Sequence, residues 1–394
     1  MKKTKIIGTI GPASKDENVL KELIINGLDI VRINMTHADL KFVQEIVNKV
    51  KNINKELNKH TAIMIDLKGP DITVDDFEGG SAYLNKGDKV RIYDDYILGD
   101  ATKFSVSYPN FVKDVKTNTI IKLNDGLIEL YVLEKGVDYL LCQVNVGGFI
   151  ENNKGVNVID TKLNIPFLSP KDIDDIKFAD KIDADYLGLS FVSNHEDVLD
   201  VNDLLINLKN DHLSIISKIE TEASLEDLDE IIKCSDGIMV ARGDLGVEIP
   251  LERVPGIQKK VLTKCHIEGK LSIVATEMLS TMENTLRPTR AEVGDVSNSI
   301  LEGTDAVLLS SETAIGNYPI ETLETMVKII EQAETEVNYY DFLDRTMRTE
   351  KQDITSSIAY NVVESSERLK AKFIVTPTMS GYTAKKISRF RPYC

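Results

Sequence analysis

The sequence has no excess of positive charge and no long apolar run. Its 394 residues carry a formal net charge of −16, which argues against DNA, RNA or an anionic membrane as the main partner. No window of about 18 apolar residues occurs, so no transmembrane helix is expected. The basic start resembles the beginning of a signal peptide, but Gly8, Gly11 and Pro12 interrupt it. A first β-strand is the better interpretation of this segment.

Motifs that mark common cofactor sites are also missing. The four cysteines, Cys142, Cys234, Cys265 and Cys394, show no CxxC spacing. This pattern predicts reduced thiols in a cytoplasmic protein and argues against a zinc site. Neither a Walker A sequence nor a GxGxxG sequence is present, so the usual nucleotide-binding signatures are absent. What remains is an ordinary globular composition, with 42% hydrophobic and 28% charged residues, in a chain long enough for about two or three domains.

Strand-like and helix-like segments alternate regularly along much of the chain. Eight strand candidates are apolar runs, as expected for parallel strands covered on both faces. They occupy residues 5–9, 30–35, 62–67, 186–192, 214–220, 237–241, 271–276 and 305–310. Helical patterns follow most of them, at residues 18–26, 39–57, 198–208, 222–233, 251–268, 289–302 and 320–337. The alternation predicts an α/β protein built on a closed (β/α)₈ TIM barrel, with a doubly wound open sheet as the alternative.

The crossover after the third strand is too long for a single helix. Between residues 69 and 168 the helical period disappears, and strand-like pieces occur at residues 89–93, 119–123, 127–133 and 139–146. This pattern predicts a small all-β domain over residues 69–164, inserted into a barrel formed by residues 1–68 and 165–340. Catalytic loops of such barrels leave from the carboxyl ends of the strands, so the insertion is expected to cover the site as a lid. An inert insertion is the alternative.

The pattern changes again after residue 340. A helix is expected over residues 353–369, a strand over 372–376 and a second helix over 382–390. Three such elements bury little by themselves. Residues 341–394 are therefore predicted to be a partial C-terminal α/β domain, or to pack on the barrel or on another subunit.

Charged residues stand at the ends of the fifth and sixth strand candidates. The fifth ends with Lys218 and Glu220, and Arg242 and Asp244 follow the sixth. The residues between the strands form an amphipathic pattern, so a βαβ unit brings these charges to one edge. Burying them is costly unless they coordinate something, and carboxylates suit Mg²⁺ or Mn²⁺. A lysine beside such a metal favours phosphate chemistry, whereas an ordinary ion pair is the alternative.

Other strand ends carry polar groups of related kinds. Arg32, Asn34 and Thr36 share one face of the second strand, where an arginine suits phosphate recognition and the two oxygens suit a second cation. Asp66, at the end of the third strand, can complete that cation site. Helix capping by Asn34 and Thr36, and solvation of Asp66 at a turn, are the alternatives. Thr276 ends the seventh strand, where a buried hydroxyl can relay a proton or simply pack.

Taken together, these stretches resemble the pyruvate kinase family. The matching runs are KIIGTIGPAS at 5–14, RIN at 32–34, KGP at 68–70, NDGLI at 124–128, SKIE at 217–220, GIMVARGDLGVEIP at 237–250, AT at 275–276, PTRAEV at 288–293 and SETA at 311–314. The resemblance implies a glycolytic, cytoplasmic phosphotransferase that converts phosphoenolpyruvate and ADP into pyruvate and ATP. It also implies a homo-oligomer, which is a tetramer in the family.

The resemblance further assigns roles to individual residues. It implies that Lys218 and Arg32 stabilise the transferring phosphoryl group and that Thr276 is tied to protonation of the enolate. The substrate is expected against Arg32, Lys218, Ala241, Arg242, Gly243, Asp244 and Thr276. Mg²⁺ or Mn²⁺ is expected on Glu220 and Asp244, and K⁺ on Asn34, Thr36, Asp66 and the carbonyl of Leu67. The nucleotide is expected near Asn34, His37 and Lys154.

Several positions depart from the family pattern. The usual run DTKGPEIR reads here DLKGPDIT, so Thr73 replaces an arginine near the phosphates, and Glu277 replaces a glutamine beside Thr276. The regulatory domain of the family also continues beyond residue 392, which makes a dimer an alternative to the tetramer. These departures favour, as an alternative function, a degenerate homologue that binds phosphoenolpyruvate or nucleotide without turnover. Another metal-dependent barrel enzyme acting on an oxoacid, such as an aldolase, is a third possibility.

Overall fold

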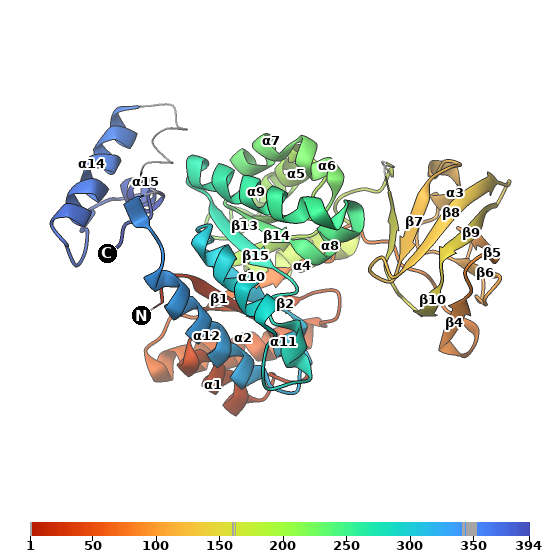
Figure 1. Ribbon diagram of the computed structural model, residues 1–394, viewed down its shortest axis with the longest axis horizontal. Helices are drawn as coiled ribbons and strands as arrows, with labels where there is room; N and C mark the ends of the chain where they lie inside the picture. The colour runs from red at the N-terminus through yellow and green to blue at the C-terminus, as the bar shows by residue number, and fades with distance from the viewer. Residues whose placement is uncertain (1, 160, 162, 341–342, 344–352) are drawn as a thin grey trace.

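A closed parallel barrel of eight strands forms the centre of the computed structural model (Figure 1). The structure describes residues 2–159, 161, 163–340, 343 and 353–394. Around the barrel lie β1 (Lys5–Thr9), β2 (Ile30–Asn34), β3 (Ala62–Asp66), β12 (Tyr186–Leu189), β13 (Ser214–Ile219), β14 (Gly237–Ala241), β15 (Leu271–Ala275) and β16 (Ala306–Leu309), which pairs with β1. Each strand falls within its predicted range, and the closed barrel is confirmed.

Helices surround the barrel and bury its strands. They are α1 (Glu17–Asn26), α2 (Leu40–Leu57), α4 (Pro170–Lys181), α5 (His195–Leu208), α6 (Glu222–Glu226), α7 (Leu228–Cys234), α8 (Arg242–Glu248), α9 (Val254–Glu268), α10 (Arg290–Leu301), α11 (Ser311–Ala314) and α12 (Pro319–Thr335). All five residues of β14 are buried, as expected for a strand covered on both faces. Side chains such as Ile7, Met64 and Met239 fill the interior as one apolar cluster. A filled centre leaves the ends of the strands as the place for a site.

Several helices differ from the sequence prediction, including the short helices α11 and α3 (Phe111–Asp114), which were not predicted. The helix expected over residues 222–233 is divided into α6 and α7 at Asp227, whose carboxylate accepts the backbone N–H of His195 at 2.7 Å. Helix α4 was not predicted, although Ser169 and the proline after it form a clear N-terminal capping signal. Helix α8 was not predicted either, because Gly243 and Gly246 lower the helix propensity of that segment.

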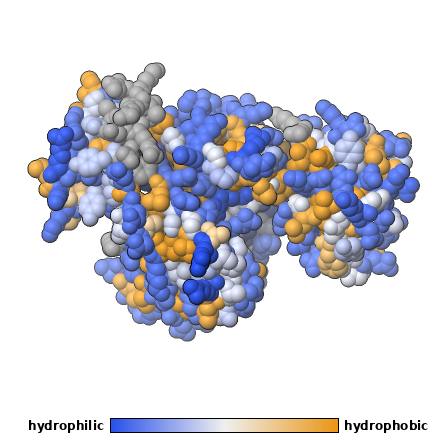
Figure 2. All heavy atoms as spheres, in the orientation of Figure 1, coloured by the Kyte–Doolittle hydropathy of each residue, from blue (hydrophilic) through white to orange (hydrophobic). Residues whose placement is uncertain are grey.

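Between β3 and β12 the chain forms two further sheets, on the right in Figure 1. One has six strands in the order β11-β7-β8-β9-β5-β6, and the other pairs β10 with β4. The elements are β4 (Ser81–Leu84), β5 (Lys89–Tyr93), β6 (Lys103–Ser105), α3 (Phe111–Asp114), β7 (Ile120–Leu123), β8 (Ile128–Lys135), β9 (Tyr139–Val146), β10 (Gly148–Glu151) and β11 (Val156–Val158). They enclose an apolar cluster of their own. Figure 2 shows an indentation between this part of the molecule and the barrel. The boundaries at residues 69 and 164 stay predictions.

The C-terminal helices α14 (Ile354–Arg368) and α15 (Tyr382–Ser388) lie on the side of the barrel away from the inserted sheets (Figure 1). The prediction of a strand over residues 372–376 is wrong. Phe373 and Val375 are 76% and 83% exposed, and no strand of the described residues pairs with this segment. A strand needs a hydrogen-bonded neighbour, which the sequence pattern alone does not supply. The boundary predicted at residue 341 lies outside the described residues.

Two general expectations can also be compared with the structure. No helix among the described residues is both long and apolar enough to cross a bilayer. The four cysteines are all unpaired, and Cys142 and Cys265 are buried.

Candidate active site

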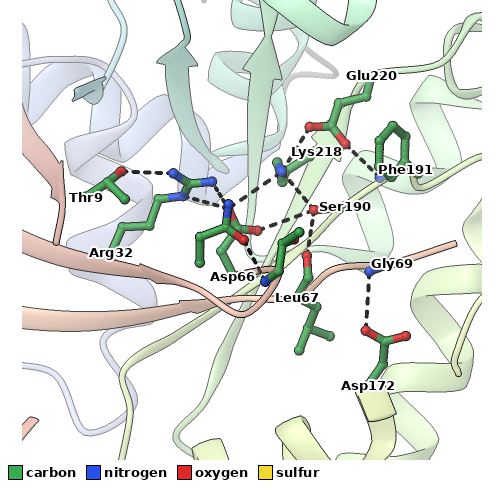
Figure 3. Close-up of polar contacts among 12 residues, drawn as sticks. Thr9, Arg32, Asp66, Leu67, Gly69, Asp172, Ser190, Phe191, Lys218 and Glu220 are labelled. Atoms are coloured by element: carbon green, nitrogen blue, oxygen red, sulfur yellow. Dashed lines mark hydrogen bonds and ion pairs between the residues drawn. The ribbon is translucent and has the colours of Figure 1, made fainter. Parts of the chain in front are cut away.

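A buried lysine lies at the carboxyl ends of β3, β12 and β13 (Figure 3). The Lys218 Nζ atom is 2.9 Å from Glu220 Oε1 and 3.6 Å from Asp66 Oδ2, and it donates a hydrogen bond of 2.8 Å to Ser190 Oγ. The two-residue strand period explains why Lys218 and Glu220 face the same way. Because Glu220 also accepts the backbone N–H of Phe191 at 2.7 Å, its carboxylate has a fixed orientation.

Arg32 extends this charged network across β2. Its Nε atom donates to Asp66 Oδ2 at 2.6 Å, its Nη2 atom is also 2.6 Å from that oxygen, and its Nη1 atom donates to Thr9 Oγ1 at 2.9 Å. Asp66 therefore lies between the guanidinium and the Lys218 ammonium, as Figure 3 shows. Two cations fixed by one carboxylate form a rigid positive site suited to an anion.

The pKa values of these groups follow from burial and from neighbouring charges. Burial raises the pKa of Asp66, but the charges of Lys218 and Arg32 outweigh it and hold that pKa below its usual range. Burial lowers the pKa of Lys218, while Asp66 and Glu220 raise it to a net value above the ordinary one. Burial, helped by the charge of Asp244, raises the pKa of Glu220 to about 7. The network therefore holds its lysine charged, whereas Lys218 alone does not offset the effect of burial on the pKa of Glu220.

Glu220 and Asp244 are the two carboxylates expected to hold a divalent cation. Burial also raises the pKa of Asp244, with the charge of Asp125 adding to this effect. Two carboxylates that disfavour each other's charge are stabilised when a cation binds between them. No group of three or more His, Cys, Asp or Glu side chains in the described part of the chain is arranged to hold a metal. Mg²⁺ is commonly held by one or two carboxylates together with substrate oxygens, so this pair fits it.

The predicted substrate positions Ala241 to Asp244 join β14 to α8. Ala241 is buried at the end of the strand, and Arg242 begins the helix. The backbone N–H of Gly243 donates to Thr276 Oγ1 at 2.7 Å, which brings the end of β15 to this junction. The Arg242 guanidinium, by contrast, contacts Thr276, Met278 and Asp295. Thr276 is therefore close to the backbone expected to face the substrate.

The positions expected to bind K⁺ lie at the neighbouring ends of β2 and β3. Asn34 is opposite Asp66 in the strand register. The Asn34 side-chain oxygen accepts the backbone N–H of Thr36 at 3.0 Å, and Thr36 is exposed. The carbonyl of Leu67 accepts the Ser190 hydroxyl at 2.7 Å. This is a set of oxygen donors of the kind that binds alkali and alkaline-earth cations.

The two other nucleotide positions lie in different parts of the chain. His37 follows β2 and is exposed. Lys154 lies between β10 and β11 of the inserted sheets, with its Nζ atom 3.7 Å from Glu151 Oε2. Among the described residues, no hydrogen bond or ion pair joins either side chain to the Lys218 network, so their role stays a prediction.

The inserted sheets contact the barrel at α8. The Lys122 ammonium donates to the carbonyl of Val247, and Asn157 Nδ2 donates to Glu248 Oε1 at 2.9 Å. Asp125, in the turn between β7 and β8, is close enough to Asp244 to raise its pKa. This turn of the insertion therefore lies near the barrel carboxylates.

Ser190 is the residue of this network that the sequence did not reveal. It accepts a hydrogen bond from Lys218 and donates one to the Leu67 carbonyl. It therefore connects the lysine expected to bind the phosphoryl group with the carbonyl expected to bind K⁺. The only signal in the sequence is its place near the carboxyl end of the fourth strand candidate, residues 186–192. A serine at a strand end is too common to indicate a site.

Comparisons with known proteins agree with this geometry. The family model described as "Pyruvate kinase, barrel domain" matches residues 1–323, and "Pyruvate kinase, alpha/beta domain" matches residues 356–394. The chain is 41% identical to pyruvate kinase of Clostridium perfringens, over 100% of this chain and 84% of the relative. It is 42% identical to pyruvate kinase of Clostridium acetobutylicum, over 100% of this chain and 83% of the relative.

A solved structure gives the same result. A pyruvate kinase from Cryptosporidium parvum superimposes with a TM-score of 0.94 at 36% sequence identity, covering 99% of this chain and 81% of that chain. The matched region includes the barrel, the inserted sheets and the C-terminal helices. The chain therefore belongs to the pyruvate kinase family of glycolytic phosphotransferases.

Proposed function

We propose that this chain transfers the phosphoryl group of phosphoenolpyruvate to ADP, giving pyruvate and ATP, with Mg²⁺ and K⁺ as cofactors. The family generally uses both ions. The observation that carries the proposal is the buried network of Lys218, Arg32, Asp66 and Glu220 at the carboxyl edge of the barrel. This network combines two fixed cations with Glu220, one of the two carboxylates proposed to hold a divalent metal.

Lys218 and Arg32 are proposed to bind the transferring phosphoryl group. Phosphoryl transfer depends on positioning and on neutralising charge more than on covalent chemistry. A lysine and an arginine already held by Asp66 need little reorganisation when the substrate arrives. Asp66 is then a positioning group, since it orients both cations without itself carrying the reacting atoms.

Glu220 and Asp244 are proposed to hold the divalent cation. When bound, that ion would add positive charge beside the oxygens of the substrate and of the enolate. Glu220 is oriented by the Phe191 N–H and Lys218, and Asp244 stands in the first turn of α8. Asn34, Thr36, Asp66 and the Leu67 carbonyl are proposed to hold K⁺, and Asn34, His37 and Lys154 to lie along the nucleotide.

Thr276 is proposed to serve the last step, in which the enolate takes up a proton at its methylene carbon. Its hydroxyl accepts the Gly243 N–H at 2.7 Å, so it lies beside the backbone assigned to the substrate. The inserted domain, docked on α8 through Lys122 and Asn157, is proposed to limit the access of water to this site.

The proposal is tested by measuring ADP-dependent pyruvate formation with each ion present or replaced. We expect turnover that needs Mg²⁺ or Mn²⁺ and falls when K⁺ is replaced by tetramethylammonium. Lys218→Met keeps the apolar part of the side chain, removes the charge and is expected to lower kcat about 100- to 1,000-fold. Lys177→Met, on an exposed lysine of α4, is the matched control and should leave kcat unchanged.

Two further measurements separate the alternatives. Binding of Mn²⁺, followed by its paramagnetic resonance signal, should be lost in Glu220→Gln combined with Asp244→Asn, whatever the activity. Tight binding of phosphoenolpyruvate by the wild type without any product would show a degenerate homologue and contradict the proposal. Release of pyruvate from an oxoacid in the absence of ADP would indicate an aldolase instead.

A further inference from the structure

Two consecutive residues after β15 have a left-handed backbone. Thr276 has φ = 65° and Glu277 has φ = 52°. Residues other than glycine rarely adopt this conformation, and a β-branched threonine is poorly suited to it. Such backbone persists only where the surroundings enforce it. Some contact must therefore hold the bend formed by Thr276 and Glu277.

The side chain of Arg242 provides this contact. It is buried, and its Nη2 atom donates to the carbonyl oxygens of Thr276 at 2.7 Å and of Glu277 at 3.2 Å. The same nitrogen is 2.9 Å from Met278 Sδ. On its other side, Nη1 is 2.5 Å from Asp295 Oδ2 on α10. The guanidinium therefore bridges α10 and the backbone of the bend.

The bend also fixes the Thr276 hydroxyl. This hydroxyl accepts the Gly243 N–H at 2.7 Å and donates to the Ala275 carbonyl at 2.6 Å. Ala275 pairs with Ala241 in the barrel register, so the ends of β14 and β15 are directly adjacent. Two consecutive residues of the β14–α8 junction thus hold Thr276, one by its carbonyl and the other by its hydroxyl.

We propose that Arg242 is a positioning residue that sets the place of the Thr276 hydroxyl by holding the left-handed bend. The effect of Arg242 on catalysis rests on the proposed function, whereas its contacts with the bend do not depend on that function. In the step concerned, the methylene carbon of the enolate takes the proton of the Thr276 hydroxyl, so that this O–H bond breaks while the electrons of the enolate carbon–carbon double bond form the new C–H bond. The enolate oxygen becomes the ketone oxygen of pyruvate, and solvent returns a proton to the hydroxyl. A guanidinium suits this role because its planar donors reach two carbonyls and a carboxylate together, which a lysine ammonium cannot do.

The test compares four variants with the wild type. Arg242→Lys keeps the positive charge but loses the planar set of guanidinium donors. It is expected to lower kcat about 100-fold, because a displacement of the Thr276 hydroxyl by about 1 Å suffices for such a loss. The KM for phosphoenolpyruvate should change little. Thr276→Ala should slow the enzyme comparably, and Arg242→Lys added to Thr276→Ala should cause no further loss, since both act through one hydroxyl. Arg253→Lys, on an exposed arginine paired with Glu222, is the matched control.

A second readout does not depend on turnover. The Gly243 amide donates to the Thr276 hydroxyl, so its hydrogen exchange should be faster in Arg242→Lys than in Arg253→Lys. Wild-type kcat in Arg242→Lys, fully additive losses in the double variant, or a change in KM alone would overturn the inference. If the wild type itself formed no pyruvate, the proposed function would fail, and the Gly243 exchange rate alone would decide the role of Arg242.

Discussion

At the scale of single residues, the site depends on how closely β12 approaches β3. Gly188 is opposite Asp66 in the register of these strands. A Cβ atom on Gly188 would lie 2.6 Å from Asp66 Oδ1, which is far inside normal contact distance. Only glycine therefore lets Asp66 stand between Arg32 and Lys218.

This contact gives a prediction for Gly188→Ala. The methyl group should displace the Asp66 carboxylate and release both cations, so that kcat falls about 100-fold while overpacking destabilises the fold by about 1–3 kcal/mol. The matched control is Gly256→Ala in α9, where an added Cβ has nothing within 4 Å. That change should be neutral or stabilising by up to about 1 kcal/mol. Wild-type kcat in Gly188→Ala, measured as ADP-dependent pyruvate formation, would contradict the role given to this glycine.

The residues of the network differ in how far the sequence could predict them. Lys218, Glu220, Arg32 and Asp66 were predicted because strand ends of one barrel meet at one edge, and the structure brings these four together. Ser190 was not predicted, because its role depends on which atoms β12 places near Lys218. The direction of the Arg242 side chain could not be predicted either, because it depends on contacts with Asp295 of α10 and with the backbone after β15.

At the scale of elements, α8 connects the barrel site to the insertion. Its first residues, Arg242 to Asp244, are among those proposed to face the substrate, and its last turn accepts hydrogen bonds from Lys122 and Asn157 of the insertion. A cation at a helix C-terminus is favourable because the last carbonyls lack partners within the helix. The same short helix therefore carries residues proposed to face the substrate at one end and contacts the insertion at the other.

We predict that Lys122→Met loosens the insertion. Loss of one hydrogen bond from a charged donor, worth about 1.5–3 kcal/mol, should raise the KM for phosphoenolpyruvate and make the connections at residues 69–72 and 163–168 more sensitive to protease. Lys135→Met is the control, because Lys135 donates to carbonyls within the insertion itself. Equal protease sensitivity of the two variants would show that Lys122 does not hold the lid.

Elements were predictable from sequence where periodicity and propensity agreed. The barrel strands have continuous apolar runs, so all eight were found. Helix α8 was missed because two glycines oppose a helix that its surroundings nevertheless stabilise. Residues 372–376 have a strand-like pattern, yet Phe373 and Val375 remain exposed because no neighbouring strand of the described residues pairs with them.

At the scale of the whole molecule, the C-terminal segment is tied to the barrel by Arg391. Its guanidinium pairs with Asp305, at 2.7 Å from Nη2 to Oδ2, just before β16. Asp305 also accepts the backbone N–H of Ser272, the second residue of β15, at 2.8 Å. Burial raises the pKa of Asp305, but Arg391 outweighs it and holds that pKa below its usual range.

Arg391→Met should therefore destabilise the protein by about 1–3 kcal/mol at neutral pH. Because the folded pKa of Asp305 is lowered, the pair stabilises fully above the unfolded pKa, and this contribution is lost as the pH falls below about 4. Calorimetry should show a lower unfolding midpoint for Arg391→Met at pH 7 and a shrinking difference from wild type in acid. Arg368→Met, on an exposed arginine of α14, is the control. If the difference in unfolding midpoint between Arg391→Met and the wild type grew in acid, the stabilising role of this ion pair would be contradicted.

The position of the insertion also constrains how the chain reaches its native state. The barrel is closed in part by the pairing of Met64 with Tyr186, and all of the inserted sheets lie between these residues. Bringing such distant partners together carries a loop-closure cost and slows folding. Because the insertion has its own apolar cluster, its early collapse would shorten the span to be closed. During synthesis on the ribosome, strands β1, β2 and β3 emerge first. The edge of β3 then stays unpaired until the whole insertion and, after it, β12 have been synthesised.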